Sequence, residues 1–86
     1  MLNVTEREME VLEVIKNTME MYGDGFSDVM IEDIVSETGF NTQTVKGLLG
    51  SLYKKDYVEY MDVNGEYNVY YLIGEALEHF DLGYLE

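Results

Sequence analysis

The stretch NTQTVKGLLGSLYKKDYV, residues 41–58, decides the fold expected for this chain. It opens with Asn41, a residue type that caps helix N-termini through its side-chain oxygen. At about 100° per residue, the apolar side chains that follow fall on one arc of a helix, and the opposite arc is polar or small. The buried arc holds Val45, Leu48, Leu49 and Leu52, and the exposed arc holds Gln43, Lys46, Gly47, Gly50 and Lys54. We predict a helix that ends near Lys55-Asp56 and has one free face.

A β-hairpin is expected after this helix. The pair Asn64-Gly65 favours a two-residue turn, because both of its central positions need positive φ. The flanking segments, residues 57–63 and 67–73, have the apolar and aromatic character of strands. A two-residue turn fixes the register. The core face expected from that register pairs Tyr60 with Val69 and Val58 with Tyr71.

Two more helices are predicted ahead of residue 41. Thr5 and Glu8 have the spacing of a capping box, and apolar residues then recur every three or four positions until Gly23. This apolar face comprises Met9, Leu12, Ile15, Met19 and Tyr22. A shorter helix is expected from about Met30 to a stop at Gly39. Its buried residues are expected to be Ile31, Ile34 and Val35.

The remaining segments are a loop and a short C-terminal helix. The loop spans residues 23–28, and Phe26 is expected to hold it against the core. Its acidic residues lack the ligand spacing of an EF-hand, so we interpret the loop as a solvated turn. The last helix follows Gly74, with Ala76, Leu77 and Phe80 on its apolar side. Together the elements predict one α+β domain over residues 1–86.

Charge is distributed unevenly along the chain. There are 18 acidic and five basic residues, which gives a formal net charge of −13. Residues 1–40 contain ten acids and residues 56–86 contain eight, whereas residues 41–55 contain none. That acid-free segment holds Lys46, Lys54 and Lys55, and we expect the three to form one cationic ridge on the predicted helix.

Composition excludes several classes of protein. Without cysteine, the chain has neither disulfides nor thiolate metal sites. No apolar run reaches the roughly 18–20 residues of a membrane span, and no basic region precedes an apolar stretch at the start of the sequence. His79 is the single histidine, and neither a phosphate-binding glycine loop nor metal-ligand spacing accompanies it. We therefore expect a cytoplasmic protein that is not an enzyme and uses no cofactor or metal.

The order of these elements resembles the winged helix-turn-helix domain of small bacterial and phage transcription regulators. Residues 4–15 are similar to the first helix of multiple-antibiotic-resistance-type regulators, and residues 31–40 to their second helix and turn. Residues 41–45, NTQTV, are similar to the start of their third helix, and Tyr57-Val58-Glu59 enters the hairpin at the family's position. The long dimerising helices of those regulators have no counterpart, so a monomer and a homodimer both stay open.

The resemblance implies a DNA-binding protein that regulates transcription. In such a domain the third helix enters the major groove of double-stranded DNA. Thr42, Gln43 and Lys46 would then read base edges, because glutamine can bond adenine and lysine can bond guanine. Thr44 and Lys54 would contact backbone phosphates.

A second hypothesis is an acidic module that docks on another protein. Gly47 and Gly50 each cost roughly 1 kcal/mol relative to alanine on an exposed helix face, which is unusual unless another molecule approaches the backbone closely. Asp62 and Glu66 place negative charge at the expected hairpin tip, where related domains often carry arginine. Such a module would bind a basic, nucleic-acid-handling host protein, as phage inhibitors that imitate the charge of DNA do. From sequence, both hypotheses stay open.

Overall fold

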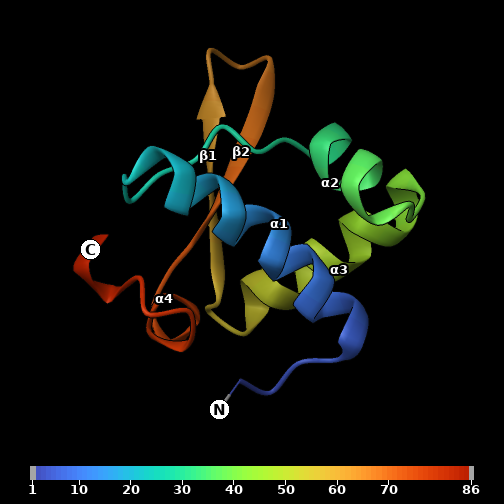
Figure 1. The fold of residues 1–86 in the computed structure, drawn as a ribbon. Helices are drawn as coiled ribbons and strands as arrows, with labels where there is room; N and C mark the ends of the chain where they lie inside the picture. The colour runs from blue at the N-terminus through green and yellow to red at the C-terminus, as the bar shows by residue number, and fades with distance from the viewer. Residues whose placement is uncertain (1, 86) are drawn as a thin grey trace.

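A computed structural model describes residues 2–85, which fold as an α+β unit with one antiparallel hairpin. The helices are α1 (Glu6–Tyr22), α2 (Ile31–Thr38), α3 (Thr42–Lys54) and α4 (Glu75–His79), followed by the 3₁₀ turn η1 (Gly83–Leu85). The strands are β1 (Val58–Val63) and β2 (Tyr67–Leu72). In Figure 1, α1 crosses the front of the molecule, α2 and α3 lie on the side away from α4, and the hairpin extends beyond the helices. Every predicted helix and strand is therefore present.

The helices begin and end at or next to the predicted residues. Thr5 Oγ1 accepts from the Glu8 amide at 3.1 Å, and the Glu8 carboxylate accepts from the Thr5 amide at 2.8 Å, which confirms the capping box. Asn41 Oδ1 accepts from the Thr44 amide at 2.8 Å and starts α3. Gly39 ends α2 at φ 80°, a left-handed conformation that glycine adopts without steric penalty. The turn between α2 and α3 is therefore short and defined at both ends.

The core lies between the helices and the sheet. Its fully buried side chains include Val11, Leu12, Ile15, Met19, Ile34, Val45, Leu52, Val58 and Leu72. Four side chains predicted to be buried pack against this core but stay partly exposed: Met9, Ile31, Val35 and Leu48. Burying one large aliphatic side chain stabilises the fold by about 1.5–3 kcal/mol, so this cluster is the main source of stability.

Two aromatic residues near the end of α1 lie outside the core, contrary to the prediction. Tyr22 is 53% exposed, and its hydroxyl donates to Asp28 Oδ2 at 2.9 Å. This hydrogen bond raises the pKa of Tyr22, because it stabilises the protonated phenol. Phe26 is also half-exposed and packs edge-on against Tyr71 of β2, with ring centroids 5.0 Å apart. The loop is therefore attached to the hairpin rather than to the core.

The hairpin differs from the prediction by one residue in register. Asn64 and Gly65 have φ of 57° and 73°, as the predicted turn requires, and Glu66 N donates to Val63 O at 3.0 Å. Glu66 then stays unpaired, because Val63 pairs with Tyr67. A slip of one residue moves a whole strand's side chains to the opposite face. The predicted core pairs of Tyr60 with Val69 and Val58 with Tyr71 are therefore wrong.

The observed register places two tyrosines beside α3. Val58 pairs with Leu72, and both are buried in the core. The next pair on the same face is Tyr60 with Tyr70, and this pair lies at the edge of the core next to α3. The free edge of β2 is held by a bridge in which Tyr70 N donates to Val29 O at 2.9 Å. This register, in which Glu66 is left unpaired, therefore places Tyr70 rather than Val69 opposite Tyr60 beside α3.

Candidate functional site

One face of α3 is open to solvent along the whole helix. Its buried side chains, Val45, Leu49 and Leu52, point into the core. The exposed residues are Thr42, Gln43, Lys46, Gly47, Gly50, Tyr53 and Lys54. The predicted division of the helix into a buried and an exposed face is thus confirmed. Of the predicted site residues only Thr44 is half-buried, in the first turn, where its amide is engaged by Asn41.

Two open hollows lie along this face and meet at Gly50. The first has a volume of about 500 Å³ and is lined by Gly47, Gly50, Ser51, Lys54 and Lys55. The second has a volume of about 300 Å³, lies between α3 and the hairpin, and is lined by Lys46, Leu49, Gly50, Tyr53, Tyr60 and Tyr70. Among the described residues, no carboxylate belongs to either lining. On a chain with 18 acids, these two linings instead bring together Lys46, Lys54 and Lys55.

The two exposed glycines of α3 are not required by packing within the chain. A Cβ built at Gly47 or at Gly50 would meet nothing within 4 Å. Alanine at either position would favour the helix by about 1 kcal/mol. The missing side chains leave the helix backbone uncovered beside both hollows, so a partner can approach it closely.

Lys55 does not belong to a cationic ridge with the other two lysines, contrary to the prediction. Its Nζ lies 2.9 Å from Glu8 Oε1 and 3.2 Å from Oε2, and it also donates to the Asn3 carbonyl at 2.9 Å. The Glu8 side chain is 3% exposed, and a buried carboxylate is costly unless it is paired. Lys55 therefore neutralises Glu8, and α3 presents Lys46 and Lys54 as its outward cations.

Glu8 stays ionised in this cluster. Burial alone would raise the pKa of its carboxyl group. Hydrogen bonds from Ser51 Oγ at 2.6 Å and from the Thr5 amide, with the hydrogen bond and charge of Lys55, outweigh burial and lower the pKa. Because Glu8 lies in α1 while Ser51 and Lys55 lie at the end of α3, the cluster fixes the orientation of α3.

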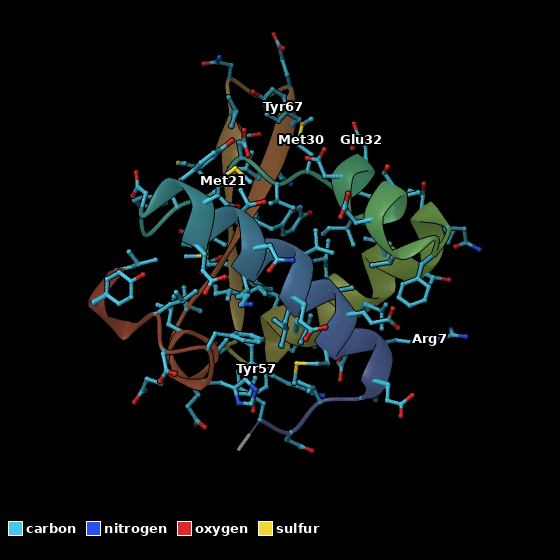
Figure 2. All side chains as sticks on the ribbon, in the orientation of Figure 1. Arg7, Met21, Met30, Glu32, Tyr57 and Tyr67 are labelled. Atoms are coloured by element: carbon cyan, nitrogen blue, oxygen red, sulfur yellow. The ribbon has the colours of Figure 1, made fainter. Side chains whose placement is uncertain are left out.

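Sequence reasoning missed two residues beside this face. Arg7 has its guanidinium carbon 5.5 Å from the ring centre of Phe40, in the turn that precedes α3. Figure 2 shows Arg7 reaching outward on the side of the molecule away from the C-terminal segment. Tyr53 lies on the exposed face, and its ring centroid is 5.5 Å from that of Tyr60. Helical spacing alone could have identified Tyr53, which follows Lys46 by about two turns.

Comparison of the chain with protein-family models, curated proteins and solved structures finds no match. Within residues 2–85, no three acidic or histidine side chains gather closely enough to hold a metal ion. None of the helices in the same part of the chain has both the length and the apolar character needed to cross a membrane. A proposal for the function therefore rests on the geometry of α3 and the hairpin.

Proposed function

We propose that this chain is a winged helix-turn-helix protein that binds double-stranded DNA, with α3 as its recognition helix and the β1–β2 hairpin as its wing. The observation that supports this most strongly is the exposed face of α3. It carries Lys46 and Lys54, and the two hollows along it have no carboxylate in their described linings. At these two hollows a polyanion would meet no lining carboxylate, although acids dominate the rest of the sequence.

The first two turns of α3 supply the groups that would read DNA bases. In helix-turn-helix domains these turns enter the major groove. Gln43 would bond an adenine and Lys46 a guanine, while Thr42 would contact either neighbouring base. Thr44 is half-buried, so its hydroxyl would reach only a phosphate at the edge of the groove. Lys54, near the end of the helix, would contact a second phosphate.

The electrostatics favour weak, short-range binding. With Lys55 paired to Glu8, the outward cations are Lys46 and Lys54, with Arg7 beside the turn that begins α3. At physiological salt, charges are screened over about 8 Å, so distant acids reduce affinity less than they slow encounter with DNA. A specific site would therefore depend on base contacts more than on phosphate contacts. A transcription regulator of prokaryotic or phage origin is the class of protein that fits this mode.

A salt titration tests the proposal. Anisotropy of a labelled mixed-sequence duplex would be followed between about 50 and 200 mM salt, and each neutralised phosphate adds about 0.9 to the slope of log K against log salt. Changing Lys54, the proposed phosphate contact, to glutamine should lower that slope by about 1, whereas Lys46→Gln should weaken binding mainly through the lost base contact. Lys16→Gln is the matched control, because Lys16 lies in α1 and pairs with Glu20 at 3.3 Å. An equal fall in the slope for Lys16→Gln, or no binding of the wild type at the lowest salt, would refute duplex binding through α3.

The second candidate function is docking on a basic protein, and the hairpin favours it. Met61 and Tyr67 are 44% and 45% exposed, and Asp62 and Glu66 lie beside them near the tip. Figure 2 shows Tyr67 near the end of the hairpin, away from the helices. Exposed aromatic residues favour a protein interface, and acidic residues suit its rim. A basic partner that loses binding to Tyr67→Ser, but not to Lys46→Gln, would support this function over DNA binding.

A further inference from the structure

Three tyrosines form a row between α3 and the hairpin. Tyr53 and Tyr60 have ring centroids 5.5 Å apart, and Tyr60 and Tyr70 have ring centroids 6.2 Å apart. Both pairs are tilted, at 47° and 46°, rather than stacked face to face. Tyr53 is 46% exposed and Tyr60 is 44% exposed. Part of the ring surface in this row is therefore available to a ligand.

The row of tyrosines lines one side of the 300 Å³ hollow whose other lining residues are Lys46, Leu49 and Gly50. Lys46 brings the one charged group of that lining, and Gly50 leaves its floor without a side chain. The volume is at the low end of the range for small-molecule pockets, which is about 300–1,000 Å³. The hollow therefore suits one planar group with an attached anion rather than a whole groove of duplex DNA.

The chemistry of the lining selects among ligands. Aromatic rings bind the flat faces of nucleobases without regard to sequence, and a lysine beside them can hold the linked phosphate. A basic peptide would bring its cations against Lys46, and a second copy of this chain would bring a further charge of −13. A single strand has a lower charge density than a duplex, so an acidic protein meets less repulsion on approaching it.

We propose that this hollow binds an unpaired nucleotide of single-stranded DNA, with its base against Tyr53 or Tyr60 and its phosphate at Lys46. The proposal rests on the DNA contact proposed for α3 and adds a preference for DNA with an unpaired segment. A duplex with an overhang would engage both parts: its paired region at Thr42 and Gln43, and its unpaired base in the hollow. Such a substrate occurs at duplex ends and at locally melted sites.

The test compares four labelled probes by anisotropy. They are a single-stranded oligothymidine of about 12 nucleotides, a blunt mixed-sequence duplex, the same duplex with an unpaired overhang, and an oligouridine RNA of equal length. The length of the single strands lies within the range of about 4–16 nucleotides that one single-strand-binding OB fold covers. We expect the overhang duplex and the single strand to bind more tightly than the blunt duplex. Because the chain has eight tyrosines and no tryptophan, stacking should also quench its intrinsic fluorescence.

Substitutions in the row separate stacking from a structural effect. Tyr60→Ala and Tyr53→Ala should each weaken single-strand binding about tenfold, the typical effect of losing one stacking ring, while Tyr60→Phe should restore it. Gly50→Gln adds a side chain to the lining of the hollow and should weaken single-strand binding; its Cβ meets nothing within 4 Å, so the helix itself should tolerate the change. Tyr84→Ala is the matched control, because Tyr84 is 72% exposed and lies in η1, outside the hollow. Circular dichroism would confirm that each variant is folded.

Each outcome decides between the two proposals. Binding of the blunt duplex that is lost in Gln43→Ala, without binding of the single strand, would overturn this inference and leave the proposed function standing. Binding of the single strand alone would support the nucleotide site in the hollow, but it would overturn duplex recognition by α3 and with it the preference for an overhang duplex. RNA binding as tight as that of single-stranded DNA, or an equal loss in Tyr84→Ala, would overturn the assignment. Failure of all four probes at low salt would overturn both proposals.

Discussion

Lys55 Nζ, in the residue directly after α3, lies 2.9 Å from Glu8 Oε1 in the first turn of α1. The side chain of Glu8 is buried and that of Lys55 is 31% exposed, so the ion pair lies at the boundary between the core and solvent. Ser51 Oγ donates to the second carboxylate oxygen at 2.6 Å. This cluster holds the C-terminal end of α3 against α1, and the exposed face of α3 depends on it for its orientation.

Replacing Glu8 with glutamine should lower the free energy of unfolding by about 1–3 kcal/mol at neutral pH, because its hydrogen bonds lose the acceptor's charge. For a domain of this size, Tm should fall by roughly 4–8 °C for each kcal/mol, which thermal unfolding followed by circular dichroism can measure. Glu13→Gln is the matched control, since Glu13 is an exposed residue of the same helix. A change in Tm no larger than that of the control would contradict a stabilising role for the cluster.

The contribution of Glu8 should also depend on pH. Its pKa in the folded protein is lowered from the usual value of 4.5. The stability that its carboxylate contributes is therefore present above that usual value and is lost as pH falls through the folded pKa. Urea unfolding at pH 7 and at about pH 3 should show a smaller difference between the wild type and Glu8→Gln at the lower pH. A stability difference of the same size at both pH values would mean that Glu8 does not stabilise the fold through its charge.

Asn41 offers a way to separate stability from binding. Asn41→Ala removes the hydrogen bond to the Thr44 amide and should cost about 1 kcal/mol in the free energy of unfolding. Asn41→Asp keeps an N-cap and should keep that stability, yet it adds a carboxylate beside Thr42 and Gln43. Unfolding curves and duplex titrations of both variants should show Asn41→Asp stable but weaker in DNA binding. Unchanged binding would place the DNA contact elsewhere.

Replacing the exposed glycines of α3 should raise stability and weaken DNA binding. Gly47→Ala and Gly50→Ala should each raise the free energy of unfolding by up to about 1 kcal/mol, because the helix gains propensity and the new methyl group meets no neighbour within 4 Å. Both should weaken binding, since the methyl groups cover the backbone. Denaturant unfolding and DNA titration measure the two effects. Greater stability with unchanged binding would show that nothing approaches the helix closely here.

Glu66 is expected to be dispensable for strand pairing. Three residues separate the paired Val63 and Tyr67. Asn64 and Gly65 form the centre of the turn, and Glu66 is the third. Deleting it leaves a two-residue loop of the kind hairpins favour, so β1 and β2 should keep their register. Backbone NOE contacts between Tyr60 and Tyr70 in the deletion variant would show that the register is kept. Their replacement by contacts between Tyr60 and Tyr71, which pairs with Glu59 in the wild-type register, would contradict this prediction.

The parts of the fold that depend on local chemistry were predictable from sequence. Asn41 and Gly39 set the turn before α3, and the helical period separated Leu49 and Leu52 from Lys46 and its neighbours. These features need only residues within a few positions of one another. The candidate face of α3 could therefore be located before the structure was known.

The features that were missed depend on long-range contacts or on one inserted residue. In the sequence, Lys55 looks like a surface charge next to Lys54. Its partner Glu8 lies 47 positions earlier, and no pattern in the residues around Lys55 indicates that pairing. The unpaired Glu66 follows a turn whose φ values were predicted correctly, yet it reverses the faces of β2 relative to β1. For that reason the row of tyrosines beside α3 could not be predicted.

The binding predictions depend on DNA contact at the exposed face of α3. Amide chemical shifts of ¹⁵N-labelled protein, recorded as a mixed-sequence duplex is added at low salt, test it most directly. We expect the largest shifts at Gln43, Lys46, Gly47 and Gly50, and small ones at the exposed Glu13 and Glu20 of α1. Shifts confined to the hairpin tip around Glu66, or none at all, would contradict it.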